Sequence, residues 1–466
     1  MGKTLVMKFG GTSVGSVEAI REVVRIVQAA RSSGDWTSVV VVVSAMSKVT
    51  DMLLGAAAAA AAGDDLRPKQ LAAEMQSRHL AALHELAPSA SAAGEAILAY
   101  LAEFVALCHA IFILGEASCR ALDAVASLGE RMSAPLVAAA LTQAEVPARA
   151  VDTANIVVTD AVYQSASPDM AATQAKAEAQ LRPLLEAGVV PVATGFIGAT
   201  PEGIVTTLGR GGSDFSGAIL GVALAAQEVW IWTDVNGVMT ADPRVVPQAR
   251  TLPELMFREI SELAFYGAKV LHPKTIRPVV ERGIALWVKN TFNAAHPGTR
   301  IIPDNGVQYG TLRAVTAFKG QQLITVEGRG MMGIPGIAAR TFAAVARTGT
   351  NVAMISQASS EQSICFVVPC AHGKQVVRAL EDEFRQELAR RDIDRITTSP
   401  ECAIVAAVGA GMRHTHGIAG RIFGALGDCG VNIIAIAQGS SECNISLVVV
   451  VDDANEAVRA IHALIE

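Results

Sequence analysis

Two glycine-rich motifs follow strand-like runs in this sequence, and both carry charged side chains. The first, Lys8-Phe9-Gly10-Gly11-Thr12-Ser13, comes at the end of the apolar run Thr4 to Lys8. Glycines before a helix let backbone N–H groups approach an anion, and the helix dipole adds to the attraction. A lysine beside them can place its ammonium against a phosphate group. An ordinary tight turn is the alternative for Gly10-Gly11 alone, and the chain contains no G-x-x-x-x-G-K-[ST] motif.

The second motif, Gly209-Arg210-Gly211-Gly212-Ser213-Asp214, repeats this design after the run Ile204 to Thr207. Arg210 can bind a carboxylate through two parallel hydrogen bonds. Asp214 has an alternative role as the N-cap of a helix from Phe215 onward, and both roles could hold together.

Three further polar segments stand near expected strand ends or helix starts. Ser44 to Thr50 follows one strand-like run, and Thr233-Asp234 follows another. Glu130 is either a first-turn helix glutamate or a carboxylate that receives a substrate ammonium. Since ligands of an open α/β sheet bind outside the carboxyl ends of its strands, we expect the two glycine-rich motifs and the two segments that follow strands to lie there.

The elements that must position these residues alternate between strand and helix through about the first 290 residues. The residues Ile20, Val23, Val24 and Val27 have the spacing of an amphipathic helix. Residues 55–116 form an Ala-rich helical insertion without a chemical motif. The pattern predicts an α/β fold with a mainly parallel sheet sandwiched by helices. The expected strands are Thr4 to Lys8, Val39 to Val43, Val189 to Ala193, Ile204 to Thr207 and Val229 to Trp232.

An internal repeat occupies the C-terminal part of the chain. A shift of 81 residues (423 minus 342) aligns Phe342 with Phe423, and Ser359-Ser360-Glu361 recurs as Ser440-Ser441-Glu442. Two copies are too few for a solenoid, so we expect two small paired β/α domains. Turn-forming residues at 296–299 suggest a boundary. We predict domains at 1–300 and 311–466, the second with repeats at about 320–390 and 400–466. The repeat also aligns Gly336 with Gly417, Asn351 with Asn432 and Gln357 with Gln438.

Several protein classes are not expected from the composition. The net charge of −6 without basic runs gives no electrostatic footprint for nucleic acid. The seven cysteines form no C-x-x-C pair, and we predict neither a disulfide framework nor a metal site. The longest uninterrupted apolar runs are too short to span a bilayer, and no signal peptide opens the chain. We therefore expect no membrane segment and a cytoplasmic location.

One motif points toward a dinucleotide fold. Residues 328–333 fit G-x-G-x-x-G after a strand-like run. The second copy of the repeat, at 409–414, lacks the third glycine. Dinucleotide binding is therefore not expected.

Taken together, the motifs make the sequence resemble the aspartokinases of the amino-acid kinase family, and the repeat resembles their paired ACT domains, each of βαββαβ type. The order and spacing match over nearly the whole chain. The matching segments are Lys8 to Val14, Ser44 to Ser47 with Thr50, Leu128 to Glu130, Thr206 to Asp214, Trp232 to Arg244 and Phe265 to Pro273.

The resemblance implies a role for each matching residue. Lys8 and Asp214 would be catalytic, with Asp214 holding Lys8 in place, and Gly10, Gly11 and Ser13 would surround the phosphates. Aspartate would be bound by Thr50, Glu130, Arg210, Gly211, Gly212 and Ser213. The nucleotide site would be lined by Thr233, Asp234, Met239, Arg244, Lys269 and Val270. Met239 stands where the family usually has tyrosine, which removes a hydroxyl and an aromatic face from the adenosine contact.

The same resemblance implies the reaction and its control. The chain would use ATP and Mg²⁺ to phosphorylate the β-carboxylate of L-aspartate, the first step toward lysine, threonine and methionine. An end-product amino acid would inhibit it, with threonine favoured over lysine, and the implied regulatory residues are Gly336, Asn351, Gln357, Asn432 and Gln438. We also expect a homodimer or higher homo-oligomer.

Two other functions remain as alternatives. One is an amino-acid kinase that acts on glutamate, N-acetylglutamate, carbamate or a nucleotide. The other is an amino-acid sensor whose kinase half has decayed. A monofunctional enzyme is expected, because the chain ends at Glu466, directly after the second repeat.

Overall fold

The computed structural model describes residues 2–268, 271, 273–304, 310–357, 362–412, 415–438 and 443–465. The chain forms two compact units. The first comprises Met1–Val238, Thr251–Phe257 and Leu271–Pro303, and the second comprises Met239–Arg250, Arg258–Val270 and Asp304–Glu466. Two segments within the predicted 1–300 domain, 239–250 and 258–270, thus belong to the second unit.

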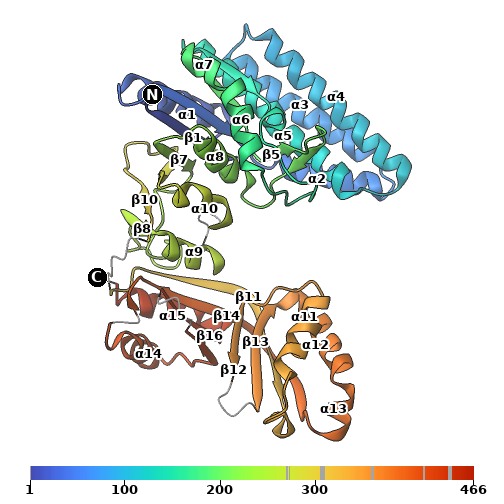
Figure 1. Cartoon of the computed structure of the whole chain (residues 1–466), viewed down its shortest axis with the longest axis vertical. Coiled ribbons are helices and arrows are strands. Elements are labelled where there is room, and N and C mark those ends of the chain that lie inside the picture. The colour runs from blue at the N-terminus through green and yellow to red at the C-terminus, as the bar shows by residue number, and fades with distance from the viewer. Residues whose placement is uncertain are drawn as a thin grey trace. The chain divides into compact units, whose positions relative to one another are not determined.

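An eight-stranded sheet forms the centre of the first unit (Figure 1). Its strand order is β3 (Ala148–Val151), β4 (Val190–Thr194), β2 (Ser38–Val43), β1 (Thr4–Phe9), β7 (Glu228–Thr233), β9 (Ala285–Asn290), β10 (Thr299–Ile302) and β8 (Glu254–Met256). Every neighbouring pair is parallel except β9 and β10. The predicted mainly parallel sheet is confirmed. The predicted strand at 204–207 pairs instead in a two-stranded sheet, as β6 (Val205–Thr207) with β5 (Ile197–Ala199).

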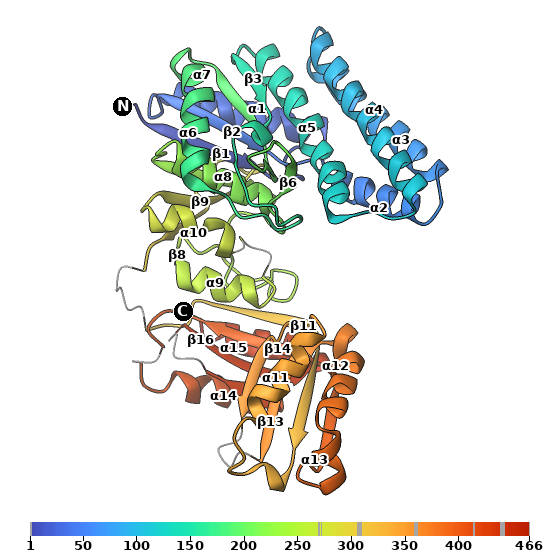
Figure 2. The ribbon, with the colours of Figure 1, turned by 45° about the vertical axis from the view of Figure 1, so that its right-hand side comes forward.

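Helices cover both faces of this sheet. On one face, α1 (Val17–Ser32) and α5 (Cys119–Gln143) enclose an apolar core that includes Leu5, Met7 and Phe9. The alternate residues of β1 face α8 (Gly212–Ala223), where a Cβ on Gly217 would lie 3.2 Å from the Lys8 Cβ. The helices α6 (Met170–Gln180), α7 (Arg182–Glu186) and α10 (Pro273–Glu281) complete the layers (Figure 2). The pleat of β1 therefore places Lys8 against α8.

The helical insertion consists of α2 (Val49–Ala61), α3 (Leu66–Leu86) and α4 (Ser91–Leu114), and α3 and α4 lie side by side (Figures 1 and 2). By length and composition, α4 could cross a membrane, with a mean hydropathy of 2.2 over its most apolar 18 residues. The sequence prediction compared only uninterrupted apolar runs and so missed this helix. In this fold, Ile97, Leu101, Phe104 and Ile111 form a buried stripe of α4 in the main core of the first unit.

The turn at 296–298, where a domain boundary was expected, joins β9 to β10 inside the first unit. Gly298 has a φ of +84°, and a Cβ there would lie 2.1 Å from the Val288 carbonyl oxygen. Glycine is required by this tight reversal, and the turn is not the end of the unit.

A six-stranded antiparallel sheet forms the centre of the second unit. Its order is β12 (Met354–Gln357), β13 (Ser363–Pro369), β11 (Ala314–Glu327), β14 (Arg395–Val408), β16 (Asn444–Val450) and β15 (Ala435–Ala437). The helices of this unit are α9 (Phe257–Phe265), α11 (Ile337–Arg347), α12 (Cys370–Glu383), α13 (Arg385–Arg390), α14 (Ile418–Asp428) and α15 (Ala454–His462).

The two repeats share their longest strands. Residues 321–327 of β11 pair with β13 of the first repeat, and residues 314–318 pair with the end of β14. Residues 402–408 of β14 pair in turn with β16 of the second repeat. The paired β/α domains predicted from the repeat are confirmed, and these two strands join them into one sheet.

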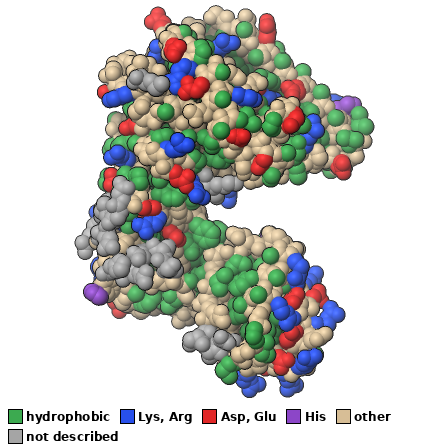
Figure 3. Space-filling model, in the orientation of Figure 1, with side chains coloured by type: hydrophobic (Ala, Val, Ile, Leu, Met, Phe, Trp, Pro, Cys, Tyr) green, Lys and Arg blue, Asp and Glu red, His purple; other side chains and the backbone are tan. Residues whose placement is uncertain are grey.

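Ion pairs connect α11 to α12 on the surface of the second unit. Arg340 and Arg347 both contact Glu383, at 2.9 and 2.6 Å. Figure 3 shows basic and acidic side chains interspersed where these helices face the viewer. Exposed pairs of this kind contribute little to stability, so the apolar core beneath them holds the helices.

Candidate active site

Lys8 and Asp214 form an ion pair at the carboxyl end of β1. The distance from Lys8 Nζ to Asp214 Oδ1 is 2.6 Å, and Lys8 is 8% exposed. Helix α8 begins at Gly212 with Gly211 at its N-cap, so Asp214 lies in the first turn. The alternative of Asp214 as the N-cap is therefore wrong. The carboxylate holds the lysine ammonium at the strand end instead.

The loop after β1 presents unpaired backbone amides. The Gly10 N–H donates to the Trp232 carbonyl at 3.1 Å, so the predicted phosphate-binding role cannot use this amide. Within the described part of the chain, the amides of Gly11, Thr12 and Ser13 have no hydrogen-bond acceptor. Successive free N–H groups of this kind form an anion-binding concavity.

The Ser13 side chain serves the loop itself. Its Oγ is fully buried and lies 2.7 Å from Thr291 Oγ1. It also donates to the Trp232 carbonyl at 3.4 Å. Because the hydroxyl already has these partners, it ties the loop to the neighbouring strand ends, and the Ser13 backbone amide remains the group that can face a phosphate.

The second glycine-rich motif forms a tight turn before α8. Gly209 and Gly211 have φ values of +77° and +71°, a conformation that favours glycine. Arg210 between them is exposed and has no hydrogen-bond or ion-pair partner among the described residues. The amides of Ser213 and Asp214 at the start of α8 also have no acceptor there. This turn thus offers a free guanidinium beside a helix N-terminus.

Glu130 lies in the interior of α5, so its alternative as a first-turn glutamate is wrong. It is 3% exposed, and its Oε2 has no hydrogen-bond partner in the described part of the structure. Burial raises the pKa of Glu130 to about 8, although the Ala45 amide and the Lys8 charge act in the opposite direction. Gly129 permits this position, since a Cβ there would lie 2.7 Å from the Ala45 Cβ.

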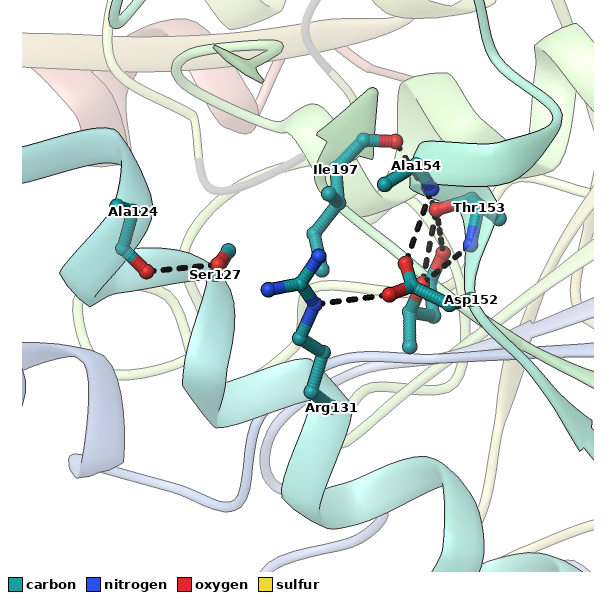
Figure 4. Close-up of polar contacts among 8 residues, drawn as sticks. Ala124, Ser127, Arg131, Asp152, Thr153, Ala154 and Ile197 are labelled. Carbon is teal, nitrogen blue, oxygen red and sulfur yellow. Dashed lines mark hydrogen bonds and ion pairs between the residues drawn. The ribbon is translucent and has the colours of Figure 1, made fainter. Parts of the chain in front are cut away.

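The next residue of α5 anchors the helix to the end of β3. Figure 4 shows the Arg131 side chain extending from α5 toward Asp152, with 2.9 Å between Nε and Oδ2. Asp152 also accepts from the Ala154 amide at 3.0 Å. The Thr153 hydroxyl lies 2.8 Å from the Thr194 carbonyl oxygen, next to β4. These contacts fix α5, and with it Glu130, against the sheet.

Asp123 is a structural residue of the site that the motifs did not predict. Its buried carboxylate accepts from the Thr207 amide and hydroxyl, at 2.9 and 2.7 Å, and from the Gln164 amide. It therefore ties α5 to β6, just before the Arg210 turn. Thr207 is 84 positions away in the sequence, so no local pattern signals this contact.

The predicted nucleotide residues are distributed over both units. Thr233 ends β7, and its hydroxyl donates to the exposed Asp234 at 3.2 Å. Both residues belong to the first unit and lie at the end of the strand that pairs with β1. Met239 and Arg244 belong to the second unit, where Arg244 pairs with Asp242 at 2.6 Å. Lys269 and Val270 lie outside the described residues.

Thr50 lies half-buried in the first turn of α2. It follows Lys48, which has a left-handed φ of +69°. Such a conformation is strained for lysine and is often found at functional sites. The predicted aspartate-binding threonine therefore lies at the start of a helix, directly after a loop with a specific backbone shape.

A cavity of about 290 Å³ lies in the first repeat, and Gly336 and Gln357 both line it, with Met331, Ile337 and Ile364. Gly336 has a φ of +92° at the start of α11. Asn351, Asn432 and Gln438 are exposed and are not part of this lining. The two Ser-Ser-Glu copies at 359–361 and 440–442 lie outside the described residues. Two of the five predicted regulatory residues, Gly336 and Gln357, thus line the same cavity.

The dinucleotide motif at 328–333 has a packing explanation. A Cβ on Gly328 or Gly330 would lie 2.3 or 2.6 Å from backbone atoms of Asp392. The glycines let two chain segments approach closely, so close packing alone accounts for them.

Comparison with known proteins agrees with this fold. Residues 3–290, more than half of the chain, match the amino acid kinase family. The chain belongs to the amino acid kinase family. Residues 324–384 and 405–464 each match the ACT domain.

The proteins that the chain resembles include plant enzymes. The bifunctional aspartokinase/homoserine dehydrogenase of Daucus carota is 40% identical over 465 residues, which are 98% of this chain and 50% of that protein. Aspartokinase 1 of Arabidopsis thaliana is 32% identical over 99% of this chain and 80% of its own length. The chain spans about half the length of the first curated relatives it matches.

Solved structures resemble the chain over its full length. E. coli aspartokinase III in complex with aspartate and ADP has a TM-score of 0.81 at 30% identity, covering 99% of both chains. The same enzyme in complex with lysine and aspartate has a TM-score of 0.78 at 31% identity, covering 99% of this chain and 100% of that one. The fold of these aspartokinases thus extends over 99% of the chain.

Proposed function

We propose that this chain catalyses the ATP-dependent phosphorylation of the β-carboxylate of L-aspartate. The observation that carries the proposal is the Lys8–Asp214 ion pair, which lies beside two loops whose amides have no acceptor among the described residues. The likeness to an aspartokinase that was solved with aspartate and ADP supports this choice of substrates.

The chemistry follows from charge. The β-carboxylate of aspartate is already ionised at pH 7, so no general base is needed to form the nucleophile. The difficulty is to bring this anion up to a polyanion, and positioning with electrostatic stabilisation does most of the work in phosphoryl transfer. A carboxylate oxygen attacks the γ-phosphorus of ATP, the bond to the β-phosphate oxygen breaks, and the products are β-aspartyl phosphate and ADP.

Lys8 and the loop amides meet this requirement. The lysine ammonium offsets charge on the transferring group, while Asp214 fixes its direction. The amides of Gly11, Thr12 and Ser13 donate to phosphate oxygens. Each of these groups is held in place before the reaction, so little reorganisation is needed.

Aspartate is held by Arg210 and Glu130, each of which has polar atoms without a partner among the described residues. Arg210 binds the α-carboxylate through its exposed guanidinium. Glu130 receives the α-ammonium at its unpartnered Oε2, and the ammonium compensates the carboxylate that burial disfavours. Because Arg210 is a cation and Glu130 is a carboxylate, they fix the orientation of the bound amino acid.

We expect Mg²⁺ to bind together with ATP, as a complex with its phosphates. Within the described residues, no group of three or more His, Cys, Asp or Glu side chains could hold a metal ion. Mg²⁺ in phosphoryl-transfer sites is held largely by the substrate phosphates and water, with one or two carboxylates. Asp234 at the end of β7 is an exposed carboxylate that could complete such a shell.

An end-product amino acid inhibits the enzyme by binding in the first repeat. The cavity at Gly336 and Gln357 has room for an amino acid, and Gln357 supplies amide groups for it. We favour threonine as the effector, with lysine second. The shift between active and inactive arrangements is limited by the effector's differential affinity for the two.

A hydroxamate assay tests the function directly, because hydroxylamine traps an acyl phosphate as a coloured product. ATP with aspartate should give hydroxamate, while glutamate, N-acetylglutamate and carbamate should not. Threonine, lysine and methionine are then added singly and in pairs. Product from glutamate but not from aspartate would assign the chain to a different amino acid kinase.

A further inference from the structure

Arg78 of α3 connects the two loops beside Lys8. Its Nη1 donates to the Ser47 carbonyl at 2.7 Å, and its Nη2 donates to the Gly15 carbonyl at 2.8 Å. Gly15 lies in the loop after β1, and Ser47 lies in the loop after β2. One half-buried guanidinium therefore spans both loops.

The two loops touch where Arg78 holds them. The Ser47 amide donates to the Gly11 carbonyl at 3.1 Å. A Cβ on Gly15 would lie 2.9 Å from the Gly11 carbonyl oxygen and 3.2 Å from the Ser47 Cβ. Gly11 also carries one of the unpaired amides of the phosphate loop. The contact held by Arg78 is thus adjacent to the groups that face the phosphates.

The two hydrogen bonds orient peptide planes. In a planar trans peptide, the C=O and the next N–H point in opposite directions, so fixing the carbonyls of Gly15 and Ser47 also fixes the amides of Ser16 and Lys48. Lys48 has a left-handed φ of +69°, and strained residues persist only where their surroundings hold them. Arg78 bonds the carbonyl immediately before this residue.

The interaction is directed at the backbone. Among the described residues, Arg78 has no carboxylate partner, and its two hydrogen bonds both end on main-chain oxygens. The planar fork of a guanidinium can donate to two acceptors at once, which a lysine ammonium on a single flexible stem reproduces poorly. The residue type therefore matches the geometry of the contact.

We propose that Arg78 is a positioning residue for phosphoryl transfer. It holds the loops at 10–16 and 44–50 in register, so that Lys8, the free amides and Thr50 face the same substrate groups. This role rests on the proposed function. It also gives the helical insertion at 55–116, for which no chemical motif was predicted, a part in shaping the site.

The first test measures the loops themselves by hydrogen exchange. Arg78→Met keeps most of the side-chain length and removes both donors, while Arg67→Met changes an exposed arginine of the same helix as a control. Exchange of the hydrogen-bonded loop amides of Val14, Gly15 and Ser47 should rise together in Arg78→Met and stay unchanged in the control. Continued protection of β1 and of the second unit shows that the variant remains folded.

The second test measures turnover and nucleotide affinity. A loop displacement of about 1 Å can cost about 100-fold in rate, so kcat/KM should fall by about 10–100-fold in Arg78→Met and less in Arg78→Lys. Guanidinium chloride at low millimolar concentration should restore part of the activity of Arg78→Met, which a purely structural role does not predict. ADP affinity, measured by calorimetry, should fall in the same order.

Two results would overturn the proposal. Wild-type exchange in both loops of Arg78→Met would show that the arginine does not hold them. Turnover equal to that of Arg67→Met, without any response to guanidinium, would show that holding them has no catalytic consequence. A wild-type chain that does not phosphorylate aspartate would instead overturn the proposed function, and the exchange and ADP measurements would still decide the role of Arg78.

Discussion

The Lys8 ammonium lies 2.6 Å from the Asp214 carboxylate, with the two side chains 10% and 18% exposed. Lys8 is the second-last residue of the buried strand β1, and Asp214 lies in the first turn of the helix that packs on that strand. The pair therefore links the sheet to the N-terminus of α8. It stands beside the amides of residues 11–13 and 213–214, which have no acceptor among the described residues, so Lys8 is expected to face the transferring phosphate.

Lys8→Ala should abolish phosphoryl transfer while the fold survives. The change removes the cation that faces the transferring group, and loss of such a contact costs about 10²–10³ or more in kcat. Lys3→Ala, at an exposed position before the same strand, is the matched control. The assay is hydroxamate formation, with circular dichroism to check folding. Near-normal turnover of Lys8→Ala would show that its assignment is wrong.

Arg210→Lys should raise KM for aspartate strongly and KM for ATP little. An ammonium cannot reproduce the two parallel hydrogen bonds of a guanidinium to a carboxylate. Arg149→Lys, at another exposed position of the first unit, should change neither value. Steady-state kinetics with each substrate varied in turn decides the matter, and the opposite pattern would place Arg210 on the nucleotide side.

Glu130→Gln should remove the part of the pH dependence of the unfolding free energy that arises from this carboxyl group between about pH 5 and pH 8. Burial raises the pKa of Glu130 from its ordinary value of 4.5 to about 8, so between these values the folded state keeps a proton that the unfolded state has lost. The contribution of this group to the unfolding free energy therefore falls as pH rises through that window. Melting temperatures without aspartate should shift in favour of Glu130→Gln from about pH 5 to pH 8. A constant difference would show that the carboxyl is ionised throughout.

Aspartate binding should also depend on this carboxyl. If the substrate ammonium pairs with ionised Glu130, binding near pH 7 releases a proton, and KM for aspartate falls as pH approaches about 8. Calorimetry in buffers with different ionisation enthalpies measures the proton release. Binding by wild type without proton release would contradict the assignment.

Gln357→Ala should weaken feedback inhibition and leave uninhibited turnover nearly unchanged. Gln357 lines the cavity of the first repeat, whereas Gln438 occupies the equivalent position of the second. Gln438→Ala is therefore the matched comparison, and the repeat whose variant resists inhibition contains the effector site. If threonine at millimolar concentration neither inhibits wild type nor shifts its melting temperature, the threonine assignment is lost and lysine is tested next.

The chain should form at least a dimer. Ile355 on β12 and Ile436 on β15 are 49% and 42% exposed, and these are the edge strands of the sheet in the second unit. Exposed apolar side chains on sheet edges favour association. Light scattering should give a mass above that of the 48.5 kDa monomer. A monomer at micromolar concentration would contradict this prediction.

The sequence predicted the fold because its signals are local. Buried parallel strands are continuous apolar runs, as in Val39 to Val43, and the internal repeat is visible without a structure. The same holds for Lys8 and Asp214, since glycine-rich turns at strand ends mark the edge where a ligand binds. The Lys8–Asp214 contact itself was expected from the family resemblance and agrees with the 2.6 Å distance.

Only the tertiary structure decided which groups are free to act. Gly10 and Gly11 are the same residue type, yet the Gly10 amide is bound to Trp232, 222 positions away, and the Gly11 amide has no acceptor in the described chain. Glu130 acquires its raised pKa from burial within α5, and Arg78 reaches Gly15 and Ser47 across the fold. Burial and hydrogen bonding between distant segments depend on how the elements pack. The sequence around each of these residues does not indicate that packing. The sequence alone therefore determined the elements and the motifs, and the packing of α3, α5 and α8 around the sheet determined their chemistry.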